Sequence, residues 1–197
     1  MQAVQSIAQN ETLYDADNNS RYYVHCGQLA FQNNGYLTPG IHPITLEGFE
    51  TFFTKAIPDR LIRERLFLGY CKLCNTIKSF QTNNFTQWIG GSFTTSKPNP
   101  GDIDVITFIS FSELESIPNH IQNQLMNTNI LHEQLTGSNA KNLYECDSYI
   151  LLVPPKTTKS YNEYIQQKMY WRGVWGFDRK DVPKGFLQIT YGRGVEQ

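Results

Sequence analysis

The chain has 197 residues, of which 40% are hydrophobic and 18% charged, and its formal net charge is -1. Its four cysteines are too few and too scattered for a disulfide scaffold, and no apolar run approaches the roughly 18 to 20 residues that a membrane span needs. The first 20 residues are polar, unlike a secretory leader, so we expect a cytoplasmic protein with no membrane contact.

One strand and two helices are predicted before residue 81. Residues 1–20 lack sustained periodicity, and an alternating pattern predicts a strand over 21–31. Thr45 is suited to cap a short helix that ends near Ala56. A longer helix is expected over 58–80, because a proline at its start suits the first turn. Its inward side chains are expected to be Leu61, Ile62, Leu66, Leu73 and Ile77.

Strands dominate the predictions for the second half. They are expected over 87–89, 102–108, 144–153 and 185–191. Together with the helices they predict an α/β (α+β) fold, in which a mixed sheet is flanked by helices. We expect one domain over 26–197, preceded by an extension of unknown role over 1–25.

Two capping boxes predict the helices between these strands. Ser112 with Glu115 begins a helix, or a broken helix, that Gly137 ends. Ser160 with Glu163 begins the other, which gives way to a loop after residue 173.

Two aspartates open the strand over 102–108. Asp102 and Asp104 stand at i and i+2, so they share one face of the strand, about 6.6 Å apart. Adjacent anions are costly unless a cation lies between them, and their carboxylates can converge on one or two Mg²⁺ ions. A third carboxylate from a later strand would complete the site. Asp147 is our candidate, and Glu145 on the same predicted face is the alternative.

A glycine-serine turn precedes the two aspartates by about ten residues. Gly91 allows the backbone to approach a phosphate, and the hydroxyl of Ser92 can bond a phosphate oxygen. Thr95 and Lys97 extend this polar rim. Alone, such a turn is often only a tight turn, but followed by Asp-x-Asp it becomes more specific.

Charge is unevenly distributed along the chain. Residues 80–155 hold seven acids and two bases, whereas residues 156–193 hold eight bases and three acids. An acidic metal centre beside a basic phosphate-binding wall would give this distribution, and so would two unrelated solvated faces.

Four aromatic residues lie within the basic segment. They either stack a base or an RNA end, or they belong to the core. They are Tyr170, Trp171, Trp175 and Phe177.

The Gly-Ser turn, the Asp-x-Asp pair and the later strand acid resemble the nucleotidyltransferase superfamily, which has a polymerase-beta-like fold. Motifs over 35–43, 91–98 and 176–185 are similar to those of a group of short prokaryotic nucleotidyltransferase-like proteins. The resemblance covers roughly residues 30–191 and leaves the N-terminal extension outside.

The resemblance implies a nucleoside triphosphate donor such as ATP, and a nucleotide that passes to an acceptor hydroxyl or phosphate with release of pyrophosphate. It implies Mg²⁺ (or Mn²⁺) held by Asp102, Asp104 and Asp147, which would then be the catalytic residues. Basic groups would stabilise the leaving pyrophosphate. The expected nucleotide-binding residues are Gly91, Ser92, Thr95, Lys97, Arg172, Arg179 and Lys184.

Two hypotheses of function follow. The first is a nucleotidyltransferase that modifies a macromolecule, either an RNA end or a protein hydroxyl, as in toxin or phage-defence systems, with an antitoxin-like protein as a candidate partner. The second is a non-catalytic module that keeps the fold and binds a nucleotide or a partner. Cations bridging the aspartates would favour the enzyme, and a basic side chain in their place would favour the module. The basic C-terminal segment argues against a third class, an antibiotic-modifying enzyme.

Overall fold

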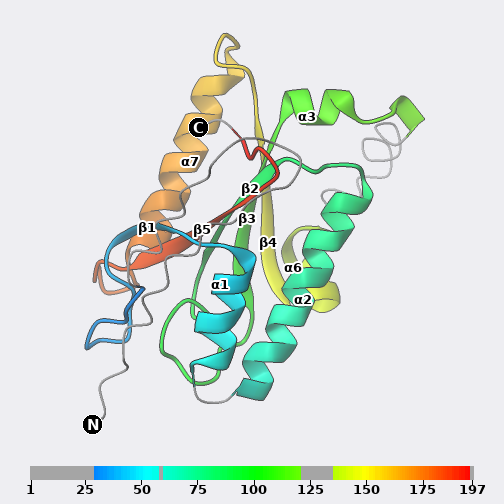
Figure 1. Cartoon of the computed structure of the whole chain (residues 1–197). Helices are drawn as coiled ribbons and strands as arrows, with labels where there is room; N and C mark the ends of the chain where they lie inside the picture. The colour runs from blue at the N-terminus through cyan, green and yellow to red at the C-terminus, as the bar shows by residue number, and fades with distance from the viewer. Residues whose placement is uncertain (1–28, 58–59, 121–134, 196–197) are drawn as a thin grey trace, which may run out of the picture.

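The computed structural model describes residues 29–57, 60–120 and 135–195 (Figure 1). Within these ranges five strands form one sheet in the order β1-β5-β2-β3-β4. The strands are β1 (Gly40–Pro43), β2 (Phe85–Gly90), β3 (Ile103–Ser110), β4 (Cys146–Val153) and β5 (Gly185–Tyr191). The predicted strand over 21–31 lies largely outside the described residues.

The sheet mixes parallel and antiparallel pairs. β2 is antiparallel to both β3 and β5, whereas β3 with β4 and β1 with β5 are parallel. In this register Asp104 stands beside Gly90 on one side and beside Asp147 on the other. The expected mixed sheet flanked by helices is therefore confirmed, and its hydrogen bonding fixes two of the three aspartates next to each other.

Helices cover both faces of the sheet (Figure 1). Thr45 caps the first of them as predicted, because its hydroxyl oxygen accepts a hydrogen bond from the backbone N–H of Gly48 at 3.0 Å. The helices are α1 (Leu46–Glu50), continued by the π-helix η1 (Thr51–Lys55), α2 (Arg60–Ser79), α3 (Phe111–Ser116), α6 (Gly137–Tyr144) and α7 (Ser160–Gly176).

Two hydrophobic clusters form the core, one on each face of the sheet. The larger packs α1, η1 and α2 against the sheet, with Phe49, Tyr70 and Val105 among its buried members. The smaller packs α7 onto the other face, around Trp88 and Trp175. The two clusters divide the side chains of β3 by their alternation, so the even-numbered residues of β3 face α7.

The predicted inward face of the long helix is partly wrong. Leu66, Leu73 and Ile77 are buried, but Leu61 is 82% exposed because it lies in the first turn of α2 and points away from the sheet. The predicted start over 58–59 lies outside the described residues.

Both capping boxes are wrong in detail. Ser110, not Ser112, caps α3, since its hydroxyl oxygen accepts from the N–H of Glu113 at 3.0 Å. The N-cap position of α7 is Lys159, with no side-chain cap bond, so Ser160 is already helical.

Two helix ends also differ from the predictions. Gly137 begins α6, which the sequence patterns did not predict, rather than ending a helix. The helix predicted before it falls largely on 121–134, outside the described residues. α7 continues through residue 173 to Gly176, where a loop was expected, because Trp175 anchors its last turn in the core. In the described ranges, no helix combines the length and the apolar character that crossing a membrane requires.

Candidate functional site

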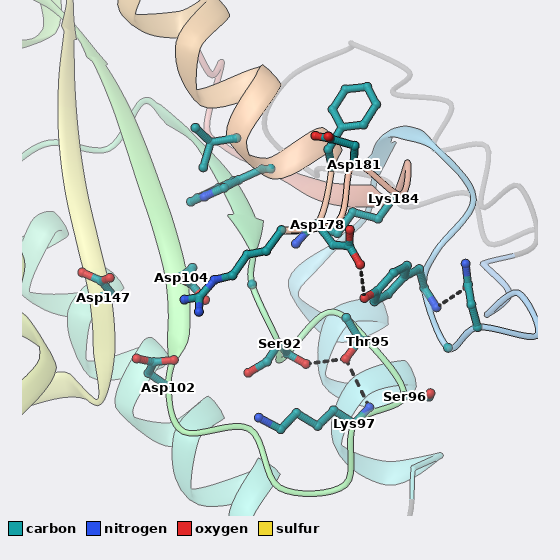
Figure 2. A pocket seen from close by; sticks show the side chains of 18 of the residues that line it. Ser92, Thr95, Ser96, Lys97, Asp102, Asp104, Asp147, Asp178, Asp181 and Lys184 are labelled. Atoms are coloured by element: carbon teal, nitrogen blue, oxygen red, sulfur yellow. Dashed lines mark hydrogen bonds between the residues drawn. The ribbon is translucent and has the colours of Figure 1, made fainter.

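A pocket of about 1080 Å³ lies on the α7 face of the sheet, where β2 ends and where β3 and β4 begin (Figure 2). Its walls are the starts of β3 and β4, the loop after β2, the C-terminal end of α7 and the loop that leads into β5. Nine of the ten predicted site residues line it: Gly91, Ser92, Thr95, Lys97, Asp102, Asp104, Asp147, Arg179 and Lys184. The tenth, Arg172, is exposed on α7 and does not line the pocket.

The three aspartates come from the adjacent strands β3 and β4. Asp102 directly precedes β3, Asp104 is its second residue, and Asp147 is the second residue of β4. The parallel register places Asp104 opposite Asp147, at the strand spacing of about 4.8 Å. Among the described residues, however, no group of three or more His, Cys, Asp or Glu side chains stands close enough to hold a metal ion. The three carboxylates line the same pocket but do not converge on a common point.

Asp147 and Glu145 are separated by the fold. Glu145 precedes β4 and caps α6 in a left-handed conformation (φ 55°), and its Oε1 lies 2.9 Å from Nη1 of Arg65. It does not line the pocket, whereas Asp147 does. The strand predicted over 144–153 begins two residues later in the structure, at Cys146. Of the two candidates for the third carboxylate, only Asp147 lies beside Asp104.

A lysine that we did not predict reaches the aspartates. Nζ of Lys141, on α6, donates to Oδ2 of Asp102 at 2.6 Å. The lysine side chain is 54% exposed, so the pair lies at the edge of the pocket. It partly neutralises one carboxylate, and this is the kind of contact that we expected of the non-catalytic module.

Asp104 is the electrostatic centre of the group. Burial, followed by the neighbouring charges of Asp102 and Asp147, raises its pKa from 3.8 to about 6, against the opposing effect of Lys184 and Lys141. Burial is also the main reason why the pKa of Lys184 is lowered. Carboxylate oxygens are the ligands that Mg²⁺ and Mn²⁺ prefer, and a bound cation would offset the repulsion among these carboxylates. The donor set therefore fits a divalent cation.

The turn after β2 lies against Asp104. Gly91 has a positive φ of 69°, and a Cβ at this position would lie 1.5 Å from Oδ2 of Asp104. A side chain here would displace the carboxylate, so the position requires glycine for both its backbone and its space. Ser92 follows and lines the pocket, so its hydroxyl is available to a phosphate bound there, as the sequence predicted.

The hydroxyl of Thr95 is used within the loop over 91–97. It donates to the carbonyl oxygen of Ser92 at 2.8 Å and accepts from the N–H of Lys97 at 3.1 Å. Thr95 is also buried. Its side chain therefore shapes the loop, and a direct bond to a nucleotide would require these contacts to break.

The residue that holds this loop was missed by the sequence analysis. Arg63 of α2 is fully buried, and its guanidinium donates to four backbone carbonyls. The acceptors are Phe53 at 3.2 Å, Phe93 and Thr95 at 2.8 Å each, and Lys97 at 2.6 Å. A signal was available: positions 63, 66, 70, 73 and 77 form one helical stripe, and an arginine within an apolar stripe needs buried acceptors.

A second missed contact closes the far side of the pocket. The hydroxyl of Tyr36 donates to Oδ2 of Asp178 at 2.8 Å, while Oδ1 accepts from the N–H groups of Lys180 and Val182. These bonds, the backbone ones first, lower the pKa of Asp178. They fasten the loop that carries Arg179 to the segment before β1.

Comparison with known proteins gives one match. A family model described as a family of unknown function (DUF6932) matches residues 29–190. No curated protein and no solved structure matches the chain significantly.

Proposed function

We propose that this chain, which belongs to the family of unknown function DUF6932, is a metal-dependent nucleotidyltransferase that moves a nucleotide from a nucleoside triphosphate to a macromolecular acceptor. One observation carries the proposal. Three aspartates, the Gly91-Ser92 turn and Lys184 line the same pocket, although they come from four separate segments of the chain. Its resemblance to the nucleotidyltransferase superfamily rests on the same residues.

Asp102, Asp104 and Asp147 would hold Mg²⁺ or Mn²⁺. Such ions, when bound, stabilise the charge on the attacking and leaving oxygens of an in-line displacement. The acceptor hydroxyl oxygen would form a bond to the α-phosphorus while the bond from that phosphorus to the bridging oxygen breaks, and pyrophosphate would leave. The hydroxyl proton would pass to a carboxylate oxygen of Asp147.

The chain's basic and polar groups would bind the triphosphate. The backbone at Gly91 and the hydroxyl of Ser92 would contact its phosphates, and Lys97 is exposed at the same rim. Lys184 stands near enough to Asp104 and Asp178 to feel both charges, so it can offset the negative charge of the departing pyrophosphate.

A second function, the non-catalytic module, is favoured by one observation. Lys141 is already paired with Asp102, and the carboxylates are not gathered around a common point in the described part of the chain. In such a module the lysine would replace the cation permanently. The exposed position of the pair argues for the enzyme, because a solvated ion pair is worth little and a divalent cation can displace it.

The test uses the purified protein with each α-labelled nucleoside triphosphate, Mg²⁺ or Mn²⁺, and total cellular RNA and protein. The Asp102→Ala/Asp104→Ala variant removes the carboxylates, and Glu163→Gln removes a charge at the distant start of α7 as a matched control. We expect label on RNA or protein with the wild type and the control only. Absence of label, together with no nucleotide binding by calorimetry, would favour the module.

A further inference from the structure

The C-terminal half of α7 exposes several large apolar side chains. Met169 is 68% exposed, Tyr170 64%, Val174 45% and Phe177 48%. Tyr170 and Val174 are spaced i and i+4 on one face of α7, and Phe177 follows directly after the helix as its extended C-cap residue. Val174 and Phe177 also line the pocket, which makes this face a continuation of the pocket wall towards solvent.

Tilted and edge-to-face ring contacts connect this face to the core. Trp171 lies 4.6 Å from Tyr149, 5.4 Å from Tyr170 and 5.9 Å from Trp175, measured between ring centroids. Trp175 is buried and lines the pocket, so the predicted aromatic group divides into a core part and an exposed part. Tyr149 stands two residues after Asp147 on the same face of β4. Tyr170 is therefore connected through Trp171 to Tyr149, on the Asp147 side of the pocket.

Bases outnumber acids in the segment that carries the aromatic face. Residues 168–184 hold five bases and two acids. One of those acids, Asp178, already accepts two backbone bonds and the hydroxyl of Tyr36. Burial, followed by the charges of Arg172 and Lys156, lowers the pKa of Lys168, so Lys168 is repelled by a base on α7 and by another in the loop before it. A polyanion would relieve this repulsion.

The dimensions suit a short single strand. Tyr170 and Phe177 are separated by seven residues, or about 10 Å along a helix, which is close to the length of three stacked nucleotides at about 3.4 Å each. The pocket, at about 1080 Å³, is at the upper end of the roughly 300 to 1,000 Å³ of most ligand sites, and it opens towards this aromatic surface through Val174 and Phe177.

We infer that the acceptor is the single-stranded end of a nucleic acid, whose bases stack on Tyr170 and Phe177 and whose terminal hydroxyl enters the pocket beside Asp147. This inference rests on the proposed function and names the acceptor of the same site. Exposed Met, Tyr and Phe side chains also suit a protein partner. The excess of bases in this segment favours the nucleic acid, because Lys and Arg side chains neutralise its phosphates and so strengthen binding.

The test is fluorescence anisotropy with 12-nucleotide single-stranded RNA and DNA, and with duplexes of the same sequences, in chelator and without nucleoside triphosphate. We expect Tyr170→Ala to weaken single-strand binding about tenfold or more, because stacking on an aromatic ring contributes about 1–3 kcal/mol per base. Phe177→Ala should act in the same direction. Leu68→Ala removes an equally exposed apolar side chain from α2, on the other face of the sheet, and should leave binding unchanged.

Equal binding by Tyr170→Ala and the wild type would overturn the inference, and so would a preference for the duplexes. A protein that binds nucleoside triphosphate and labels cellular protein, but ignores every oligonucleotide, would retain the proposed transferase and make its acceptor a protein. Oligonucleotide binding by a wild-type chain that neither binds nucleoside triphosphate nor transfers label would support the surface and remove the proposed function.

Discussion

The aspartate wall of the pocket and the glycine-serine loop beside it are held in place by different interactions. Asp104 and Asp147 are positioned by the backbone ladder between β3 and β4, which does not depend on their side chains. The loop over 91–97 depends instead on side chains: the guanidinium of Arg63 binds three of its carbonyls, and the hydroxyl of Thr95 bonds within it. The aspartate wall should therefore tolerate changes of charge, whereas the loop should be sensitive to changes at single positions.

The largest expected effect comes from Arg63→Met. The substitution keeps most of the side-chain volume but leaves four carbonyls without their donor, two of them in the fully buried residues Phe53 and Phe93. We expect the free energy of unfolding in urea to fall by about 3–5 kcal/mol, since buried polar groups that lose their partners are costly. Arg65→Met is the matched control, because Arg65 lies in the same helix in an exposed ion pair worth less than about 1 kcal/mol. Equal losses of unfolding free energy in the two variants would show that the loop does not depend on the hydrogen bonds of Arg63.

Gly91→Ala tests the contact between the glycine-serine loop and the aspartate wall. A left-handed conformation costs an alanine about 1–2 kcal/mol, and the new methyl group would also collide with the carboxylate of Asp104. Gly137→Ala isolates the first cost, because Gly137 has a similar φ of 59° and nothing within 4 Å of its Cβ position. We expect Gly91→Ala to lose more stability than this control, and to lose most of its nucleoside triphosphate affinity by calorimetry. If the two alanine variants unfold alike, the contact with Asp104 does not constrain the turn.

A smaller effect should appear in the pH dependence of stability in chelator. The pKa of Asp104 is raised to about 6 in the folded chain, against 3.8 ordinarily, so the folded state holds its proton more tightly than the unfolded state. Its contribution is fully present below about pH 4 and is lost as pH rises through about 6, by about 1–3 kcal/mol. Asp104→Asn should remove this loss while keeping the fold. The difference between the two unfolding curves should therefore grow from pH 4 to pH 7, and a constant difference would contradict the assigned pKa.

The aspartate wall and the glycine-serine loop also differ in how far the sequence predicts them. Short apolar segments predicted the strands that carry the aspartates, and the Asp-x-Asp spacing predicted two carboxylates on one face, because strand geometry is regular. The choice between Asp147 and Glu145 needed the structure. Glu145 ends α6 in a left-handed conformation, and that helix had no recognised start.

The contacts that hold the loop were not predicted for a different reason. Arg63 binds backbone carbonyls, and carbonyls carry no residue identity that a motif could reveal. Its place in the apolar stripe of α2 was the only indication. Lys141 was missed because it lies on α6, which was not predicted at all.

The smallest expected effect, from Lys141→Ala, bears on the choice between enzyme and module. The lysine of the ion pair with Asp102 is 54% exposed, so the loss of the pair should change stability by less than about 1 kcal/mol. If the aspartates hold a divalent cation, the lysine competes with it, and Lys141→Ala should bind Mn²⁺ several-fold more tightly by calorimetry, whereas Lys159→Ala, an exposed lysine directly before α7, should not. A wild type and a Lys141→Ala variant that both fail to bind Mn²⁺ would mean that the aspartate wall is built without a cation, and the non-catalytic module would then be the better proposal.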